Sequence, residues 1–558
     1  MVKKSELVLV LISIIFLSGC ANQMAPVGGE VDKIPPEVIE SYPKNRSTNF
    51  SESYLEIKFS EYVDKLSVQN SIFISPALQH GINYDWSGKS VSLEIKDTLQ
   101  ENTTYTVTVG TEVMDLNNRN KMVQPFTFAF STGSKIDTAK ISGKVYTGKT
   151  DGVMIYAYQS SKDVDPSKQN PNYVSQVGKT GSYSIVGLRD GDYKIFAMRD
   201  NMLDMLYQRN DDEYGIQSTK IEISPENTSP EHVDFFLTKE DTIAPKLNAA
   251  YMKDRSHLVV EFSEAIDSTK LSAANFTLVD TTTKKSVVPK YFYKLDARSN
   301  QFYLAFDDTS SFKDYILTVG EFEDIHSNKT ADDKISFVYK TERDTFPNSL
   351  LKAFGDLPDN KVDFENPSVS IQFADGINIE EVKSRVTIED PQKKAIEFGL
   401  TKYDDVLFRL SAKNKLKPGS EYVVKFNAKN LADISGKNVD TVYQRKFTTS
   451  TELDFSGASG IVEGADSTNI TVLESVSLPK KLYNQKNDLK QKFDFKKVIP
   501  GKYLIWTFKD KNKNGKYDAG SIQPFKYAEE FRYYTDTLNL RARWPVGDII
   551  ILSHPEKS

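Results

Sequence analysis

The stretch Leu55-Glu56-Ile57-Lys58-Phe59-Ser60-Glu61-Tyr62-Val63-Asp64 decides the fold of this chain. Apolar and polar residues alternate along it, as in a β-strand that buries one face and exposes the other. Nearly the same pattern returns at Leu258-Val259-Val260-Glu261-Phe262-Ser263-Glu264-Ala265-Ile266-Asp267. A third, more divergent copy runs from Val369 to Ile377. A strand that recurs at three places predicts a repeated β-domain.

The copies also match further along the chain. Each continues with a strand that starts at a tyrosine, then an aspartate nine to eleven residues later, and then an aromatic strand. The strands are Tyr105–Gly110, Tyr315–Gly320 and Tyr422–Phe426; the aspartates are Asp115, Asp324 and Asp433; the last strands are Phe126–Thr132, Phe337–Thr341 and Phe447–Thr449. We therefore expect three sandwich-like modules, at 34–133, 241–345 and 346–452.

A second kind of repeat lies between and after these modules. Gly191 is followed by Asp200 and Tyr207, and Gly501 by Asp510 and Tyr517, with spacings of nine and seven residues in both copies. A strand, a glycine-centred tight turn and a returning strand would give this pattern, so a β-hairpin is expected at each place. The two modules are predicted at 134–240 and 453–558.

Composition agrees with a folded chain of several domains. The 558 residues are 39% hydrophobic and 11% aromatic, and strand-forming residues alternate with Gly, Asn, Asp and Pro. This predicts an all-β protein of tandem sandwiches. The net charge of −6 and the five histidines argue against a basic surface for nucleic acid, so no nucleic-acid partner is expected.

The single cysteine, Cys20, predicts a lipid anchor. Lys3 and Lys4 precede an apolar stretch, Leu7–Leu17, that is too short to span a bilayer, and Leu17-Ser18-Gly19 leads directly to Cys20. Residues 1–19 therefore resemble a lipoprotein signal peptide, cleaved before Cys20, with residues 20–33 as a lipidated tether. The alternative is an ordinary secretory signal with an unpaired thiol, which is a liability in an oxidising compartment.

The first module resembles the SbsA-type bacterial Ig-like domain of surface proteins. The residues that carry the resemblance are Pro35-Pro36, Phe59-Ser60-Glu61, Asn102-Thr103-Thr104-Tyr105, Asp115 and Phe130-Ser131-Thr132. The start of the chain, from Cys20 through Gly28-Gly29 to Pro35-Pro36, is similar to Ig-domain lipoproteins of Bacteroidota. The third module carries a weaker version and the fourth a weaker one still. The second and fifth modules look like CnaB/transthyretin-like sandwiches. The resemblance implies a fold and a cell-envelope location, not a reaction.

The segment Asp510-Lys511-Asn512-Lys513-Asn514-Gly515-Lys516-Tyr517-Asp518 is the sharpest candidate site. Asp510, Asn512, Asn514 and Asp518 occupy positions 1, 3, 5 and 9 of an EF-hand-like calcium loop, with Gly515 at position 6. Position 12, normally a bidentate glutamate, is Ser521. The alternative is a hairpin loop rich in turn formers. Calcium, if bound, is expected to be structural, and no cofactor is required.

Other candidate residues favour structural roles. Glu61 and Glu264 occur one per module without a paired acid, and Asp115, Asp324 and Asp433 are expected to cap turns. The histidines His80, His232, His257, His326 and His554 lack zinc-type spacing and are expected at the surface or in turns. Tyr533, Tyr534, Trp506 and Trp544 could form a binding surface, or fill sandwich cores as strand aromatics usually do. We therefore expect no enzyme activity.

Together these features predict a non-catalytic, lipid-anchored outer-membrane protein that acts as a scaffold or docking subunit. The lipid fixes one end of the chain, and an outer-membrane protein is the expected partner, for example in β-barrel assembly or nutrient uptake. A surface adhesin or carbohydrate-binding lipoprotein is the alternative. The sequence leaves open whether the protein faces outward or into the periplasm.

Overall fold

The computed structural model describes residues 32–552 except 79, 161, 296–297, 308–313, 341, 345–348, 465–467 and 478. Cys20 and the predicted signal peptide therefore lie outside the described residues. The chain forms two compact units. The first holds the chain up to Val164 together with 170–197 and 220–235, and the second holds 165–169, 198–219 and the chain from Phe236 onward.

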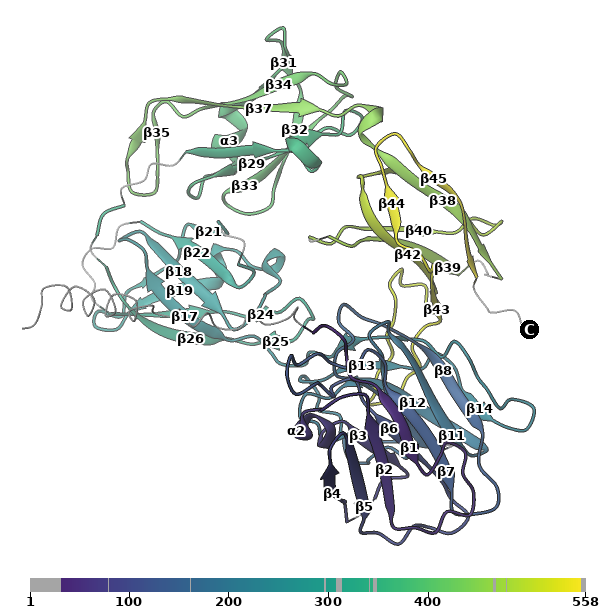
Figure 1. Ribbon diagram of the computed structural model, residues 1–558. Helices are drawn as coiled ribbons and strands as arrows, with labels where there is room; N and C mark the ends of the chain where they lie inside the picture. Colours follow the sequence, from purple (N-terminus) through teal and green to yellow (C-terminus); the bar gives the residue numbers. More distant parts are fainter. Residues whose placement is uncertain are drawn as a thin grey trace, which may run out of the picture. The chain divides into compact units, whose positions relative to one another are not determined.

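The first unit begins with a sandwich of two antiparallel sheets, drawn in purple in Figure 1. One sheet has the strand order β1-β2-β5-β4 and the other the order β3-β6-β7. The strands are β1 (Val38–Tyr42), β2 (Tyr54–Phe59), β3 (Ile72–Ser75), β4 (Ile82–Ser87), β5 (Ser90–Ile95), β6 (Thr104–Val109) and β7 (Phe126–Ser131). Helix α2 (Lys65–Gln69) follows β2, and the Asp64 carboxylate caps it by accepting a hydrogen bond from the Ser67 amide.

Strand β2 has the predicted alternation. Leu55, Ile57 and Phe59 are fully buried, whereas the side chains between them are exposed. The inward side chains of both sheets form one core. Burial of each such aliphatic or aromatic side chain contributes about 1.5–3 kcal/mol, so the alternating pattern is sufficient to select this face of the strand.

The rest of the first unit is a second group of strands. β9 pairs with β10, β8 with β11, and β12 with β14, all antiparallel. Their bounds are β8 (Ala139–Tyr146), β9 (Val153–Gln159), β10 (Tyr173–Gln176), β11 (Ser182–Leu188), β12 (Gly191–Arg199) and β14 (Ile221–Ile223), and β15 (Phe235–Phe236) lies at the division between the units.

The two halves of the first unit are joined by buried polar contacts. The Val174 amide donates to the Ser75 hydroxyl at 2.9 Å, and the Thr106 hydroxyl donates to the Val186 carbonyl at 2.9 Å. A Cβ on Gly187 would lie 2.6 Å from the Thr106 hydroxyl, so this glycine permits close approach of the two groups of strands.

The second unit contains a sandwich at residues 247–338. Its sheets have the orders β17-β18-β22-β21 and β20-β19-β23-β26, with a small pair β24-β25. The elements are β17 (Leu247–Met252), β18 (His257–Phe262), η1 (Ser268–Lys270), η2 (Ala273–Asn275), β19 (Phe276–Asp280), β20 (Ser286–Val287), β21 (Tyr291–Tyr293), β22 (Gln301–Ala305), β23 (Asp314–Val319), β24 (Phe322–Glu323), β25 (Lys329–Thr330) and β26 (Asp333–Val338).

The next sandwich covers residues 350–449. Its sheets have the orders β27-β29-β33-β32 and β28-β37-β34-β30-β31, with a pair β35-β36. The elements are β27 (Leu350–Phe354), η3 (Pro358–Asn360), β28 (Lys361–Val362), β29 (Ser368–Phe373), α3 (Ile379–Arg385), β30 (Val386–Glu389), β31 (Ala395–Ile396), β32 (Phe398–Lys402), β33 (Leu407–Ala412), β34 (Glu421–Asn427), β35 (Leu431–Ala432), β36 (Asn438–Val439) and β37 (Val442–Thr449).

The last sandwich covers residues 456–552. Its sheets have the orders β41-β38-β45 and β40-β39-β42-β43, and β44 also pairs with β42. The elements are η4 (Glu452–Asp454), β38 (Ser456–Glu463), β39 (Asn469–Ser475), β40 (Leu482–Lys486), β41 (Lys492–Val498), β42 (Gly501–Lys509), β43 (Phe531–Tyr533), β44 (Leu538–Leu540) and β45 (Val546–Leu552). The second unit also holds the short pair β13 (Glu213–Ile216) and β16 (Thr238–Lys239).

Three of the sandwiches repeat one structural detail. The strand that ends in phenylalanine pairs with the preceding strand through a shifted register, in the pairs Phe59 with Val38, Phe262 with Leu247 and Phe373 with Leu350. A bulge at the same place in three copies confirms the repeat read from the sequence. The prediction of an all-β fold of tandem β-sandwiches is likewise confirmed. The exact module boundaries stay predictions.

The predicted hairpins at Gly191 and Gly501 are wrong. β11 pairs with β8 whereas β12 pairs with β14, and β41 pairs with β38 whereas β42 pairs with β39. Each glycine turn therefore carries the chain from one sheet to the opposing sheet. This arrangement lets apolar side chains of both strands, such as Phe495 and Ile505, share one core. None of the helices in the described residues has the length and hydropathy of a membrane span.

Candidate functional site

The sandwiches are numbered by their modules, so those at residues 247–338, 350–449 and 456–552 are the third, fourth and fifth. A buried charged cluster joins the third sandwich to the fourth. The Nδ1 of His257, on β18, lies 2.8 and 2.9 Å from the two carboxylate oxygens of Asp254, and its Nε2 lies 3.1 Å from Oδ1 of Asp375. Tyr293, on β21, donates its hydroxyl to the same Asp375 oxygen at 2.9 Å. All four residues are buried. Asp375 belongs to the fourth sandwich, so these contacts cross the junction.

The His257 imidazole is protonated in this cluster. Burial alone would lower its pKa, but the hydrogen bonds and charges of Asp254 and Asp375 outweigh burial and raise the pKa to about 10. Burial would likewise raise the pKa of Asp254, yet its contacts with His257 lower it. An imidazolium between two carboxylates is a strong ionic joint, because removal of the cation would leave buried negative charge.

The prediction that the histidines lie at the surface or in turns is therefore wrong for His257. His232 is exposed, as expected, and the half-exposed His326 lies 3.2 Å from an oxygen of Asp241. The sequence signal that could have identified His257 is its place at the start of a buried strand, three residues after Asp254.

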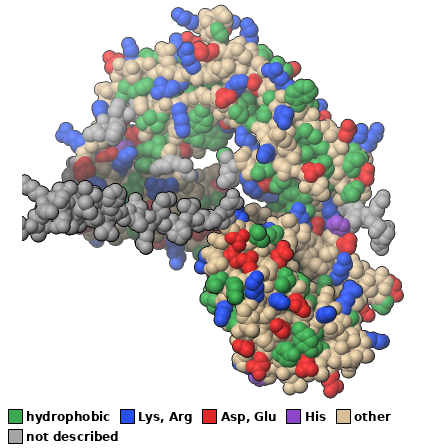
Figure 2. Space-filling view, in the orientation of Figure 1, with side chains coloured by type: hydrophobic (Ala, Val, Ile, Leu, Met, Phe, Trp, Pro, Cys, Tyr) green, Lys and Arg blue, Asp and Glu red, His purple; other side chains and the backbone are tan. Residues whose placement is uncertain are grey.

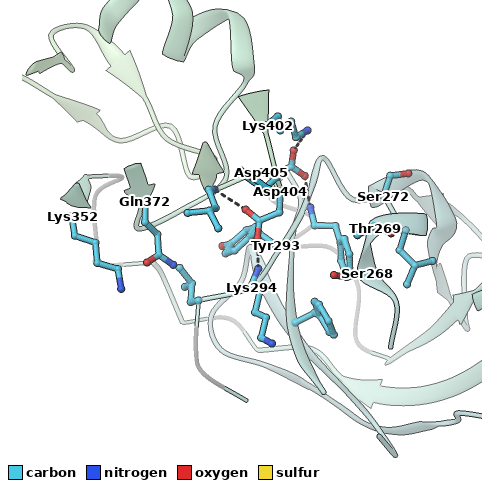
Figure 3. A pocket seen from close by; sticks show the side chains of 16 residues that line it. Ser268, Thr269, Ser272, Tyr293, Lys294, Lys352, Gln372, Lys402, Asp404 and Asp405 are labelled. Atoms are coloured by element: carbon cyan, nitrogen blue, oxygen red, sulfur yellow. Dashed lines mark hydrogen bonds and ion pairs between the residues drawn. The ribbon is translucent and has the colours of Figure 1, made fainter. Parts of the chain in front are cut away.

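A cavity of about 540 Å³ lies beside this joint, between the third and fourth sandwiches. Figure 3 shows its side chains arriving from both sandwiches. The Asp405 carboxylate pairs with Lys402 and accepts the Phe292 amide at 2.7 Å, and Asp404 accepts the Lys294 amide at 3.2 Å. The cavity is lined by Ser268, Thr269, Leu271, Ser272, Phe292, Tyr293, Lys294, Leu295, Phe302, Lys352, Gln372, Lys402, Tyr403, Asp404, Asp405 and Leu407.

The polar groups of this cavity are largely committed to the protein itself. Burial raises the pKa of Asp404 above its usual value, although three backbone amides hydrogen-bond to it. The ammonium groups of Lys294 and Lys352 lie over the rings of Phe302 and Phe354, at 5.8 and 5.2 Å. A carboxylate held by backbone amides cannot move freely to accept a proton from substrate, so the arrangement favours a structural junction over a reaction site.

A second ionic joint connects the fourth sandwich to the fifth. Lys497 pairs with Glu365 and lies 3.2 Å from Asp363, and Lys361 lies 2.7 Å from Asp454. The hydrogen bond from Lys497 lowers the pKa of the Glu365 carboxyl. The Lys497 ammonium also lies 5.2 Å from the ring centre of Phe364. These side chains are only partly buried, so this joint is weaker than the one at His257.

The four side chains predicted to bind calcium lie together in the loop after β42. The amide nitrogens of Asn512 and Asn514 point to one oxygen of Asp518, at 2.5 and 3.1 Å. The two oxygens of Asp510 accept the amides of Asn514 and Gly515, each at 3.0 Å. The side-chain oxygens of Asn512 and Asn514 accept the amides of Asn514 and Lys516, at 3.0 and 2.7 Å. These side chains therefore close the turn among themselves, and calcium binding stays a prediction.

Glu529 adds a carboxylate that the sequence comparison with an EF-hand missed. Its oxygens accept the amides of Lys511 and Asp518, at 2.7 and 3.2 Å, although it lies eleven residues beyond Asp518. Burial and the charges of Asp518 and Asp510 raise its pKa. Only the fold brings Glu529 to the loop, because the chain leaves and returns before β43.

The repeated carboxylates have the expected turn roles. The Asp115 side chain accepts the amides of residues 117–120, Asp324 accepts those of His326 and Asn328, and Asp433 accepts those of Ser435 and Lys437. Each aspartate therefore closes a turn.

The glutamates at the ends of the repeated strands lie close to other acids. Burial and the charges of Asp241 and Asp324 raise the pKa of Glu264. Burial and the charges of Asp115 and Asp32 do the same at Glu61. Within the described residues, Asp241, Asp324 and His326 lie close enough to share one ion, as do Asp254, His257 and Asp344.

The predicted aromatic surface is only partly exposed. Trp544 is 73% exposed, whereas Trp506 is 7% exposed and packs on Phe236 and Tyr533, so Trp506 fills a core, which is the second of the two roles that the sequence leaves open. Tyr533 and Tyr534 are half-buried. Figure 2 shows positive and negative side chains interspersed over most of the visible face.

Comparison with known proteins supports the Ig-like fold. A family model described as "Bacterial Ig-like domain" matches residues 32–132 and 357–449. These are the first and fourth expected modules, whereas the sequence had suggested a closer resemblance in the third module than in the fourth. No curated protein matches the chain.

Several solved structures also resemble parts of the chain. One is the N-terminal part of the bacterial S-layer protein SbsC (13% identity, 38% of this chain and 45% of that chain, TM-score 0.17). Others are titin domains I67–I69 (11%, 57% and 97%, 0.14) and part of Escherichia coli alpha-2-macroglobulin (12%, 47% and 93%, 0.16). The chain thus spans less than half of the SbsC fragment.

Proposed function

We propose that this chain is a non-catalytic, lipid-anchored scaffold or docking subunit of an outer-membrane protein complex. The Cys20 signal supports attachment to the membrane, and the bacterial Ig-like domains fit a cell-envelope protein. A membrane protein is the partner proposed, in β-barrel assembly or nutrient uptake. A similarity of the second and fifth modules to CnaB/transthyretin-like sandwiches is part of the same proposal.

The observation that carries this proposal is the ionic joint at His257. A scaffold must hold its binding surfaces at fixed spacing, and a buried imidazolium between two carboxylates of different sandwiches resists bending. The joint at Lys497 adds a second restraint. Exposed edge strands such as β40, where Leu482 is exposed, offer backbone groups to a partner strand.

Affinity purification of the tagged lipoprotein from membranes tests the proposal. The wild-type chain is expected to recover an outer-membrane protein in stoichiometric amount. His257→Ala, which breaks the joint away from any exposed surface, is expected to lower that recovery several-fold. His326→Ala is the matched control, because it removes a histidine whose ion pair with Asp241 is only partly buried. Recovery of no membrane protein by the wild type would overturn the proposal.

A surface adhesin or carbohydrate-binding protein is the second candidate, and the cavity beside the joint favours it. Aromatic rings of Phe302 and Tyr403 with Gln372 and three lysines form a lining that a sugar acid could contact. Binding of glycans by the wild type that is lost in Tyr403→Ala, with no membrane partner recovered, would favour this function.

We also propose a structural calcium ion in the Asp510 loop. Asp510, Asn512, Asn514 and Asp518 would hold it, with Glu529 close by. The ion would neutralise the carboxylates that otherwise raise the pKa of Glu529.

A further inference from the structure

The first sandwich has an apolar patch at the end where the chain enters it. Tyr62, Leu66 and Leu116 are 56%, 63% and 58% exposed. The Leu116 amide donates to the Tyr62 carbonyl at 3.0 Å, and Leu66 lies on α2, one turn beyond Tyr62. Ile34 is also exposed, and the neighbouring Asp32 accepts a hydrogen bond from Asn120, in the loop that starts at Asp115. We name these four side chains the end patch.

The fourth sandwich shows what covers the same end of the fold. There, Gly376 takes the place of Tyr62 and Ile434 the place of Leu116, counted from the matching strand-final Phe373 and turn aspartate Asp433. Both residues are buried, and a Cβ on Gly376 would lie 2.3 Å from the ring of Tyr291 in the third sandwich. The end of the fourth sandwich is therefore an interface with the module that precedes it.

The third sandwich offers a second comparison. Ala265, Thr269 and Ile325 stand where the first sandwich has Tyr62, Leu66 and Leu116. Two of the three are smaller or polar, so the large apolar set is a property of the first sandwich and not of the repeat. Each large apolar side chain left in water forfeits about 1.5–3 kcal/mol of burial, which a partner surface could recover.

What precedes the first sandwich is the tether from Cys20. Asp32 is twelve positions beyond Cys20, so even a fully extended chain keeps the end patch within about 40 Å of the lipid. The end patch carries Asp32 and Glu61 beside it, which disfavours anionic partners. We propose that the end patch contacts the lipid bilayer to which Cys20 is anchored, so that the membrane covers the first sandwich as the third covers the fourth.

This inference rests on the proposed lipid anchoring and adds an orientation to it. Tyr62 supplies a ring with a polar tip, which suits the bilayer interface, and Leu66 and Leu116 supply the apolar contact. A single lipidated residue would leave the sandwich free to tumble. The end patch would instead hold the first sandwich against the bilayer by its N-terminal end.

Depth-dependent fluorescence on the lipidated full chain tests the proposal. Leu116→Cys is labelled with an environment-sensitive NBD dye, and lipidation of Cys20 leaves the new cysteine as the single free thiol. The protein is reconstituted into phosphatidylcholine vesicles that contain a spin-labelled lipid quencher. Ile325→Cys, at the equivalent position of the third sandwich and 65% exposed, is the matched control.

The expected result is blue-shifted, quenched emission from Leu116→Cys and unshifted emission from Ile325→Cys. Adding Tyr62→Ala and Leu66→Thr, which copy the third sandwich, should reverse the blue shift at unchanged unfolding temperature. Protein that floats with the vesicles but shows equal emission at both positions overturns the inference and leaves the anchoring intact. Shielding of Leu116→Cys only after a membrane-protein extract is added also overturns it, in favour of a protein partner. Protein that does not float overturns the anchoring and this inference together.

Discussion

The third and fourth sandwiches build the same acidic corner and complete it in different ways. Two residues beyond the strand-final phenylalanine, the third sandwich has Glu264 and the fourth has Asp375. Asp375 receives the His257 imidazolium and the Tyr293 hydroxyl from the preceding module. Glu264 instead lies near Asp241, Asp324 and His326 of its own module, and burial and the two carboxylates raise its pKa. The same backbone corner therefore becomes a joint only where a preceding module supplies positive charge.

Removal of the cation should have the largest effect. His257→Ala leaves Asp254 and Asp375 buried without a counter-charge, so we expect it to cost about 3–5 kcal/mol of unfolding free energy in the third and fourth sandwiches. This loss is measured by denaturant unfolding, with hydrogen exchange of β18 and β29 as the readout. His326→Ala should change the same quantity by less than about 0.5 kcal/mol. Equal losses in the two variants would contradict the comparison.

The joint should also respond to alkaline pH. The pKa of His257 is raised from 6.5 to about 10 in the folded chain, so its stabilisation is fully present below pH 6.5. The stabilisation is then lost as the pH rises through about 10, because the folded imidazole gives up its proton.

Hydrogen exchange in β18 and β29 is expected to accelerate between pH 7 and 10, after correction for the intrinsic rate. His257→Gln should remove this excess pH dependence. An unchanged profile in that variant would mean that another group titrates at the joint.

In the Asp510 loop, a calcium ion would neutralise carboxylates, as the His257 imidazolium neutralises Asp375. Millimolar calcium is expected to raise the unfolding temperature of the full chain's last transition by a few degrees, because it binds the folded loop alone. Asp518→Asn should abolish the shift and Glu529→Gln should reduce it. Asp494→Asn, on an exposed strand position, is the control. The absence of both binding heat and thermal shift in wild-type protein would refute the calcium proposal.

The smallest expected effect is at Glu264. Glu264→Gln removes a carboxylate that Asp241 and Asp324 repel, so stability at pH 7 should rise by about 0.5 kcal/mol. The gain should disappear below the usual glutamate pKa, where the wild-type side chain is protonated too. Glu61→Gln should behave alike in the first sandwich. A loss of stability instead would mean that a cation occupies the corner.

Much of the fold could be predicted because the repeated strands carry their own burial pattern. The alternation around Leu55, Ile57 and Phe59 selects a core face without reference to distant residues. The turns at Gly191 and Gly501 were harder. The turn residues are the same whether a strand returns in its own sheet or crosses to the opposing one, and only packing decides between the two.

The candidate sites divide in the same way. The Asp510 loop is local, so its spacing could be recognised, whereas Glu529 and the pair of His257 with Asp375 depend on residues far apart in the chain. His257 and Asp375 are 118 positions apart and belong to different modules. The sequence around His257 therefore does not indicate that Asp375 is its partner.

By itself, the sequence determined that this is a chain of β-sandwich repeats, because strand alternation is a local pattern. It also predicts a lipoprotein-type signal before them, from motifs that are equally local. The tertiary structure alone decided which carboxylates are neutralised, since charge pairing depends on which module packs on which. It also decided that Trp506 is buried and that Tyr62, Leu66 and Leu116 form one surface. Those outcomes follow from contacts between distant residues, whose energies no local pattern contains.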